Sequence, residues 1–462
     1  MTEALTATLR DSDWHAPESH AARIERGRHL RASVPRSALG SVSRDPRDSN
    51  TILDAQNRGR VAELIPVRAA RMSESPFAFY RGTAALMAAD FAREPHSGII
   101  VPSCGDAHIA NFGFYASPQR TLVFDLNDFD EAAWAPWEWD LKRLVASVVI
   151  AGQASSRDQT VTETAVLSAV RAYARALRHA TEMSPRDRHA AHFDAESARW
   201  GLSEASASVL RRATKHARKR TVERAARKLT RAEPSGRLRF VAHPPTMVPA
   251  SEDVSARLFD LLARYRSTAH PDIQLLLEHY TLSDVFRRVV GVGSVGTRCA
   301  LTLMQDGDGN ALILQAKQAG RSVLEQYGEI AQPGVLNDQI DRAGEGGRVV
   351  ALQQILQAVS DPYLGYLQYD DPETGTVDFY VRQFHDMKGG IEAEEIDDEP
   401  FVTYARSCAI TLARAHAQSP AAAVIAGYIG GGRRLGTVFL EWAYAYADRS
   451  LADYRRFIAR AA

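Results

Sequence analysis

The chain has 462 residues, of which 45% are hydrophobic and 24% are charged, and its 56 lysines and arginines balance 56 aspartates and glutamates. This composition is typical of a globular protein, and the zero net charge gives no reason to expect a nucleic acid or an acidic membrane as partner. Three scattered cysteines are too few for a disulfide framework. Since no stretch approaches the ~20 apolar residues that span a bilayer and no signal peptide is evident, we expect a cytoplasmic protein.

The first half of the chain is predicted to alternate helices with short strands. After a leader with one helix near 21–32, helical spacing predicts helices over three ranges: 77–92, 139–150 and 158–231. Apolar runs next to turn signals predict three strands: 97–102, 112–115 and 121–126. Proline and glycine then mark a boundary near residue 245.

The second half is predicted to begin with strands. They are expected within 289–304, as two strands around a glycine turn, and over 311–318 and 378–384. Helices are expected over four ranges: 322–330, 349–359, 401–418 and 437–461.

A short run after the first predicted strand carries polar residues suited to phosphoryl transfer. Asp106 and Asn111 lie in the run 104–111, and Asp125 ends the second strand of the hairpin that follows. In such reactions one or two carboxylates and phosphate oxygens hold magnesium, and a loop aspartate accepts or orients the proton of the acceptor. We therefore expect Asp106 to act as the catalytic base or to orient the acceptor. Asn111 and Asp125 are expected to hold one metal ion, because the hairpin returns Asp125 to Asn111.

The segment Asp125–Glu131 is acidic enough to suggest a calcium loop. It lacks the EF-hand pattern, because Phe129 and Asp130 stand where an oxygen ligand and a glycine are required. His108 and the neighbouring aspartates suggest the metal cluster of a hydrolase, although no second histidine follows at ligand spacing. A metal-dependent hydrolase built on these residues stays an alternative.

A second motif, Gly291–Gly296, has the pattern G-x-G-x-x-G. A dinucleotide-binding turn would continue into a helix, whereas residues 297–304 predict a strand. The glycines therefore lie in a predicted β-hairpin, where a flap covers phosphates in kinases. The next strand ends in Lys317, which is costly in an apolar strand unless it is paired. We expect phosphate and Glu325, on the following helix, to pair with it.

These motifs resemble the protein-kinase-like superfamily, especially its branch of aminoglycoside and choline phosphotransferases. Residues 105–111 are similar to the H-G-D-x-H-x-x-N loop of that branch, and residues 124–128 to its I-D-[FW]-x-D segment. Asp140 and Leu141 look like the start of a further helix of that branch. Cys104 replaces the histidine that precedes Gly-Asp in the loop.

The chain is also similar to an uncharacterised bacterial family catalogued as domain of unknown function 2252. The shared stretches cover most of residues 60–450 and are 75–82, 104–111, 124–131, 137–143, 291–298 and 380–388. The family name implies no activity. The superfamily resemblance implies a kinase-like enzyme that uses ATP and Mg²⁺.

The resemblance further implies an α+β, two-lobed kinase-like fold with an altered chain order. Kinases run from the glycine loop through the lysine, a helix glutamate and a hinge to the catalytic loop, whereas here the catalytic loop comes first. We therefore expect a circular permutation. The expected parts are a leader (1–55), a large-lobe part with the catalytic loop (56–245), a small-lobe part ending in a hinge (246–390) and C-terminal helices that return to the large lobe (391–462).

The resemblance assigns roles to the residues of both motifs. Three residues are expected to be catalytic: Asp106, Lys317 and Glu325. Asn111 and Asp125 are expected to hold Mg²⁺, with Asp128 or Asp130 assisting; of these two, Asp128 is counted with the metal residues. Five are expected to bind the ATP phosphates: Gly291, Gly293, Ser294, Gly296 and Lys317.

No A-P-E signature of a kinase activation segment follows Asp125, which favours a small-molecule acceptor over a protein. Two further functions stay open beside the hydrolase. The same parts could transfer a nucleotidyl (AMP) group, or the chain could bind a nucleotide without catalysis. No membrane or nucleic-acid partner is expected.

Overall fold

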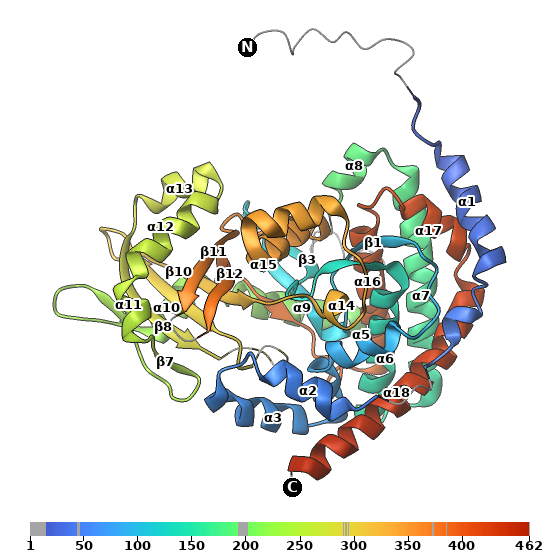
Figure 1. Ribbon diagram of the computed structural model, residues 1–462, viewed down its shortest axis with the longest axis horizontal. Helices are drawn as coiled ribbons and strands as arrows, with labels where there is room; N and C mark the ends of the chain where they lie inside the picture. Colours follow the sequence, from blue (N-terminus) through green and yellow to red (C-terminus); the bar gives the residue numbers. More distant parts are fainter. Residues whose placement is uncertain are drawn as a thin grey trace.

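The computed structural model describes residues 15–43, 47–192, 202–289, 291, 293, 295–371, 374–384 and 386–461. The fold is mixed α+β, as expected: a six-stranded antiparallel sheet lies beside a larger, mainly helical part (Figure 1). No helix in the described ranges is long and apolar enough to cross a membrane.

The first part of the chain forms helices and two small sheets. Its first helices are α1 (His20–Ser33), α2 (Ser49–Asn57), α3 (Ile65–Ser73), α4 (Pro76–Arg81) and α5 (Ala84–Phe91). Its strands are β1 (Ile100–Ser103), β2 (Phe112–Ala116), β3 (Leu122–Leu126) and β4 (Ala133–Pro136). Strands β2 and β3 form a hairpin in which Gly113 pairs with Asp125, and β1 pairs with β4. A two-residue strand, β13 (Gly389–Gly390), pairs with β2 from a distant point in the chain.

Helix α6 (Trp137–Ala154) is the centre of the helical part, and every residue from Trp137 to Gly152 is buried. The helices around it include α7 (Gln159–Glu182), α16 (Asp398–His416), α17 (Ala422–Ile429) and α18 (Arg433–Ala461). Trp137 stacks on Tyr173 of α7 with ring centroids 5.8 Å apart. The C-terminal helices therefore complete a core that the first part of the chain begins.

The six-stranded sheet has the order β11-β12-β10-β9-β8-β7, and every neighbouring pair is antiparallel. Its strands are β7 (Met247–Pro249), β8 (Thr281–Arg288), β9 (Cys299–Gln305), β10 (Ala311–Ala319), β11 (Gly365–Asp371) and β12 (Gly375–Gln383). Asp306 closes the turn between β9 and β10 by accepting the N–H groups of Asp308 (3.0 Å) and Asn310 (2.8 Å). A separate hairpin consists of β5 (Thr230–Ala232) and β6 (Leu238–Phe240).

Helices cover both faces of this sheet. On the outer face, Leu312 and Leu314 of β10 pack with residues of α12 (Leu258–Thr268) and α13 (Pro271–Leu277). On the inner face, Ile313 packs with Ala226 of α10 (Val222–Leu229). Because side chains alternate along a strand, Lys317 extends from the same face as Ile313. The remaining helices of the chain are α8 (Pro185–Ala190), α9 (Glu204–Arg218), α11 (Glu252–Ala256), α14 (Val323–Gln326) and α15 (Gly334–Leu356).

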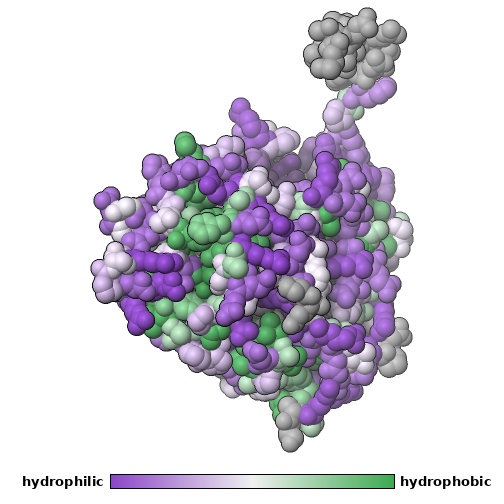
Figure 2. All heavy atoms as spheres, turned by 60° about the vertical axis from the view of Figure 1, so that its left-hand side comes forward, coloured by the Kyte–Doolittle hydropathy of each residue, from purple (hydrophilic) through white to green (hydrophobic). Residues whose placement is uncertain are grey.

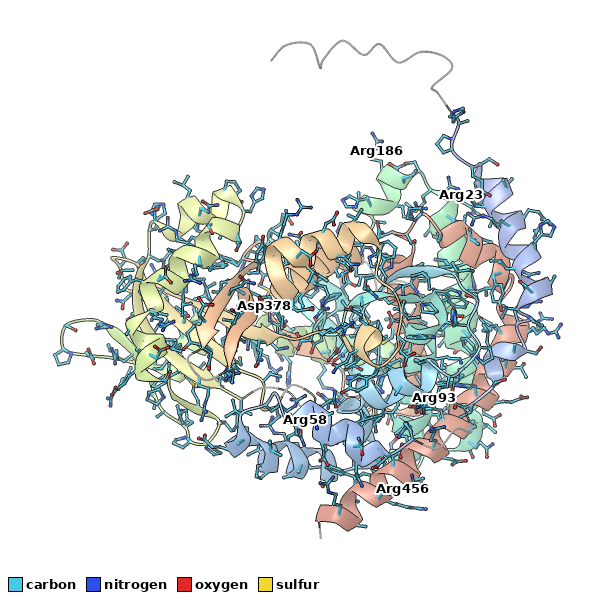
Figure 3. All side chains as sticks on the ribbon, viewed as in Figure 1. Arg23, Arg58, Arg93, Arg186, Asp378 and Arg456 are labelled. Atoms are coloured by element: carbon cyan, nitrogen blue, oxygen red, sulfur yellow. The ribbon has the colours of Figure 1, made fainter. Side chains whose placement is uncertain are left out.

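Helix α15 connects the sheet with the helical part. It is kinked at Gly344, whose φ of +66° lies in the left-handed region. Asp378 of β12 accepts the N–H of Glu345 at this kink, at 3.0 Å (Figure 3). Arg348, on the same helix, is fully buried and donates to the carbonyl of Asp130 at 3.0 Å.

The element predictions fail mainly where the sequence pattern is interrupted. The helix predicted over 77–92 is two helices, because the chain turns at Gly82 and Thr83. The helix predicted over 322–330 is the four-residue α14. The first of the two strands expected within 289–304 lies earlier, as β8, whose polar residues obscure the alternation in its sequence. Strands β2 and β3 are confirmed.

Candidate functional site

The loop that carries Asp106 is fixed by the first turn of α6. Asp140 accepts the N–H groups of Cys104 at 2.8 Å and Gly105 at 3.0 Å. Its Oδ2 lies 3.3 Å from Nε2 of His416, which is fully buried. His416 therefore supports the loop from within the core.

Gly105 lets this loop turn against the following hairpin. Its φ of +78° is a conformation that favours glycine. A Cβ at this position would overlap the backbone carbonyl of Glu131. The backbone conformation and the close contact with Glu131 therefore explain why glycine directly precedes Asp106 in the motif.

Arg143 of α6 holds the side chain of Asp106. Its Nε donates to Oδ1 of Asp106 at 2.8 Å, and its Nη2 donates to the carbonyl of Tyr80 at 2.8 Å. Burial raises the pKa of Asp106 to about 6, against the opposing charge of Arg143. The carboxylate is thereby held in one orientation, with Oδ2 left as its second acceptor.

His108 lies behind Asp106, with Nε2 3.7 Å from its Oδ2. Burial, aided by the charge of Arg143, lowers the pKa of His108 well below its usual range, so the ring is neutral. In the described part of the chain, no group of three or more His, Cys, Asp or Glu side chains is arranged to hold a metal ion. A metal at this site would need other oxygen ligands.

Asn111 and Asp128 supply such oxygens, and both line one cavity with Asp106. The Nδ2 of Asn111 donates to the carbonyl of Asp106 at 2.7 Å, which leaves its Oδ1 as an acceptor. The Oδ1 of Asp128 is buried and accepts no hydrogen bond from the described residues. This oxygen lies 3.6 Å from Nζ of Lys317, and a carboxylate oxygen that accepts no hydrogen bond is a suitable ligand for a metal cation.

Asp125 does not share this cavity, which corrects the expected pairing with Asn111. Its Oδ1 accepts the N–H of Leu126 at 2.8 Å, and its Oδ2 accepts the N–H of Ala358 at 2.7 Å. The hairpin does return the backbone to Asn111, whose carbonyl accepts the N–H of Asn127 at 2.9 Å. Since the side chain of Asp125 is 1% exposed and bound to backbone groups, its position is that of a structural residue.

Lys317 contacts the acidic residues that follow β3 directly. Its Nζ lies 2.5 Å from Oδ2 of Asp130 and 3.6 Å from Oδ1 of Asp128. The hydroxyl of Tyr380 donates to Oδ1 of Asp130 at 2.6 Å. Burial alone would lower the pKa of Lys317, but the two aspartates raise it well above its usual range, so Lys317 is charged.

Glu325 is not the partner of Lys317, contrary to the prediction. It accepts from Arg321, one helical turn earlier, at 2.7 Å. Helix α14 is too short to place Glu325 at the sheet, and the N–H of Val323 at its start donates to Glu131 at 2.8 Å. The acid that pairs with Lys317 is Asp130 and not Glu325.

Only some of the glycines between β8 and β9 lie at the site. Gly291 and Gly293 line the same cavity as Asp106. Gly296 is instead held away from it, with its carbonyl accepting the N–H of Val61 at 2.8 Å. Ser294 lies outside the described residues.

Two cavities meet at this place. We call the first the loop cavity; it measures about 340 Å³ and is lined by Asp106, Asn111, Asp130 and Glu131 among others. We call the second the sheet cavity; it measures about 720 Å³ and is lined by Gln315, Lys317, Arg382 and Lys388 among others. Asp128 and Gly291 line both cavities, so they mark the boundary between them.

Positive charge is concentrated in the sheet cavity. Lys317, Arg382 and Lys388 all line it. The charge of Arg382, together with burial, lowers the pKa of Lys388 to about 7. The lowered pKa indicates that the neighbouring cations repel the charge of Lys388 more strongly than Asp128, which also lines the cavity, attracts it.

Sequence reasoning missed several arginines of the site. Arg60 and Arg81 line the loop cavity, and within the described residues the buried Nε of each has no hydrogen-bond partner. Arg71 donates to the carbonyl of Gly291 and so holds the glycine segment. No pattern distinguishes these arginines from the others in an arginine-rich region, although Arg81 and Arg143 do lie in the stretches shared with the bacterial family.

Comparison with protein family models identifies the family of the chain. The family model described as "Uncharacterized protein conserved in bacteria (DUF2252)" matches residues 60–460. The chain belongs to this family. The match begins at Arg60 and includes the loop that carries Asp106, the β2–β3 hairpin, the glycine segment and Lys317, so both cavities are built mainly from family residues.

No curated protein and no solved structure matches the chain. The functional argument therefore depends on the site itself.

Proposed function

We propose that the protein is an ATP- and Mg²⁺-dependent phosphotransferase that acts on a small-molecule acceptor. The observation that carries the proposal is the contact of Lys317 with Asp130 and Asp128 at the boundary of two cavities. Phosphoryl transfer requires cations, an aligned acceptor and a group that orients the acceptor hydroxyl. These groups converge here from two distant parts of the chain.

In this proposal the sheet cavity takes the nucleotide. Its cations Lys317, Arg382 and Lys388 suit a polyphosphate, which would also raise the lowered pKa of Lys388. Gly291 lies at the boundary, where its backbone can approach phosphate closely. The volume of about 720 Å³ is within the usual range for small-molecule and cofactor sites.

The loop cavity takes the metal and the acceptor. Asn111 and Asp128 would hold Mg²⁺ through one amide and one carboxylate oxygen, with phosphate oxygens and water completing the shell. When bound, the ion would neutralise charge on the transferring phosphoryl group. Asp106, positioned by Arg143, would accept a hydrogen bond from the acceptor hydroxyl and take its proton.

The succession of elements supports a permuted kinase-like arrangement. The glycine segment follows β8, Lys317 lies on β10, the second strand after that segment, and α14, α15, β11, β12 and the two-residue β13 come next before the chain enters α16. This is the order of a kinase small lobe followed by its hinge. The catalytic loop, which would come next in a kinase, lies instead near the start of the chain.

The test is product analysis after incubation with Mg²⁺, ATP and a panel of hydroxyl-bearing small molecules. We expect ADP and a phosphorylated acceptor from the wild type, and neither from Asp106→Asn or Lys317→Met. Formation of AMP-modified acceptor would favour nucleotidyl transfer instead. Activity that survives Lys317→Met would favour a hydrolase, and binding without turnover of ATP would favour a non-catalytic module.

A further inference from the structure

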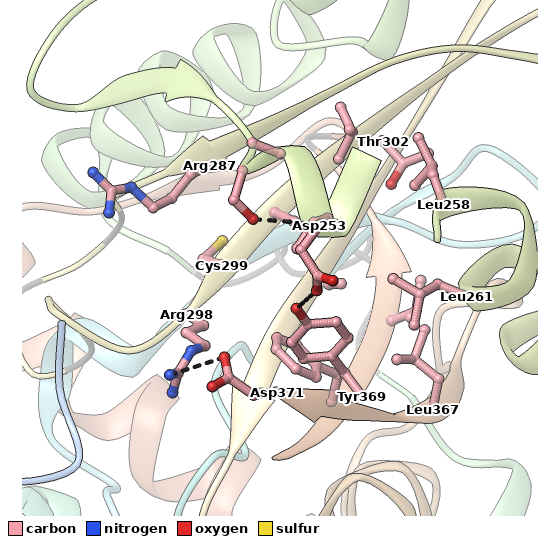
Figure 4. Close-up of a pocket in the computed structure, with 18 of the residues that line it drawn as sticks. Asp253, Leu258, Leu261, Arg287, Arg298, Cys299, Thr302, Leu367, Tyr369 and Asp371 are labelled. Carbon is pink, nitrogen blue, oxygen red and sulfur yellow. Dashed lines mark hydrogen bonds and ion pairs between the residues drawn. The ribbon is translucent and has the colours of Figure 1, made fainter. Parts of the chain in front are cut away.

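A third cavity lies on the opposite face of the sheet from the site. It measures about 630 Å³ and lies between the outer face of the sheet and helices α11 and α12 (Figure 4). Leu314 and Ala316 of β10 line it, whereas Gln315 and Lys317 of the same strand line the sheet cavity. Strand alternation therefore keeps the two spaces apart. We call this space the outer pocket.

The walls of the outer pocket are mainly aliphatic and aromatic. Leu261 of α12 packs beside Leu367 of β11, and Leu367, Phe379 and Val381 form part of the sheet wall. Figure 4 shows Leu261 and Leu367 on the same side of the space, next to Tyr369. A space of this size with apolar walls and a few polar groups has the form of a small-molecule site.

The charged residues that line the outer pocket are all paired within the protein. Arg298 lies 3.2 Å from Asp371, and Arg287 lies 3.2 Å from Glu63. Asp253 lies 3.3 Å from Arg257 and also accepts from the hydroxyl of Tyr369. A charged ligand would have to be desolvated without a free counter-charge, whereas an uncharged apolar ligand would not.

We propose that the outer pocket binds an uncharged, mainly apolar small molecule. The ligand would lie between α12 and the sheet, with its apolar surface against Leu261, Leu314 and Ala316. This inference is independent of the proposed transferase activity, because none of its contacts lies in the loop cavity or the sheet cavity.

The test uses a pair of fluorescent probes that differ by one charge. N-phenyl-1-naphthylamine is uncharged, and 1-anilinonaphthalene-8-sulfonate is its sulfonated analogue. We expect the uncharged probe to bind saturably to one site with increased emission, and the sulfonate to bind at least about tenfold more weakly. Mg²⁺ and ATP should not displace the uncharged probe, because the pocket is on the other face of the sheet.

Two substitutions locate the probe. Ala316→Phe fills the space and should abolish binding without lowering the melting temperature, since a new ring in a real cavity gains contacts. Phe259→Ser is the matched control for adsorption of the probe to the surface. Phe259 is also on α12, but it is 74% exposed. Such a control is needed because apolar side chains also appear among polar ones on the face of the molecule drawn in Figure 2. This substitution should leave binding unchanged.

Four results would overturn the proposal. They are the absence of saturable binding, tighter binding of the sulfonate, loss of binding in Phe259→Ser but not in Ala316→Phe, and unfolding of Ala316→Phe. The last result would mean that the pocket has no room for a ring. Leu261→Trp, from the helix side, provides a second filling variant with the same expected loss.

Discussion

The Nζ of Lys317 lies 2.5 Å from Oδ2 of Asp130, although the two residues are 187 positions apart in the chain. The contact joins β10 of the large sheet to the acidic segment between β3 and β4 in the helical part. It brings the glycine segment, the lysine and the loop of Asp106 around two adjoining cavities. The proposed function depends on this junction.

Lys317→Met is expected to destabilise the protein by about 2 kcal/mol, because it leaves two carboxylates next to each other without their shared cation. The loss should be smaller when Asp130 is already asparagine. A double-substitution cycle of melting temperatures with Lys317→Met and Asp130→Asn measures this coupling. Strictly additive effects would show that the two side chains do not interact in solution.

Asp125→Asn and Asp128→Asn form a matched pair that separates structure from function. Asp125 accepts two backbone N–H groups with two carboxylate oxygens, and an amide has only one such oxygen. We expect Asp125→Asn to lower stability by about 2 kcal/mol. Asp128→Asn should retain the melting temperature and lose the stabilisation that Mg²⁺ and ATP give to the wild type. If Asp125→Asn instead retained its melting temperature and lost the stabilisation by Mg²⁺ and ATP, Asp125 would be the metal ligand.

Gly105→Ala should disturb the loop that carries Asp106. The substitution introduces a Cβ that overlaps the carbonyl of Glu131 at a positive φ. A cost of about 2 kcal/mol or more is expected, together with loss of turnover, because the loop must shift and carry Asp106 with it. Gly98→Ala is the control, since Gly98 also has a positive φ but a Cβ there meets no atom within 4 Å. Equal effects of the two substitutions would contradict the overlap.

Lys388 is expected to make stability depend on pH. Arg382 and burial lower the pKa of Lys388 from its ordinary value of 10.5 to about 7 in the folded protein. Between these values the unfolded chain binds more protons than the folded chain, so this group makes stability rise with pH over that window. Below about pH 7 Lys388 is charged in both the folded and the unfolded state, so the full destabilisation of the folded protein by this charge is present. Lys388→Met should therefore stabilise the protein most at about pH 6 and progressively less toward about pH 10, as measured by thermal melting. A difference that does not change with pH would contradict the lowered pKa.

Local patterns predict the parts of this site but not the directions of its side chains. The strands of the β2–β3 hairpin are evident from apolar runs on either side of a turn. The direction of the Asp125 side chain, away from Asn111, is not evident from the sequence, because its partner Ala358 lies 233 positions further along the chain. Arg71, which holds the glycine segment, is equally remote from Gly291. Lys317 was predicted because a lysine in an apolar strand requires a partner, yet which acid provides it is decided by the packing of α15 and the hairpin.

The central claim is that Lys317 and Asp128 belong to one nucleotide site, and isothermal titration of the full chain with Mg²⁺ and ATP tests it most directly. The wild type is expected to bind one nucleotide in a Mg²⁺-dependent manner. Lys317→Met and Asp128→Asn should each abolish that binding, while Lys215→Met, at an exposed lysine of α9, should not. Absence of binding to the wild type, or equal affinity in all four proteins, would contradict the account.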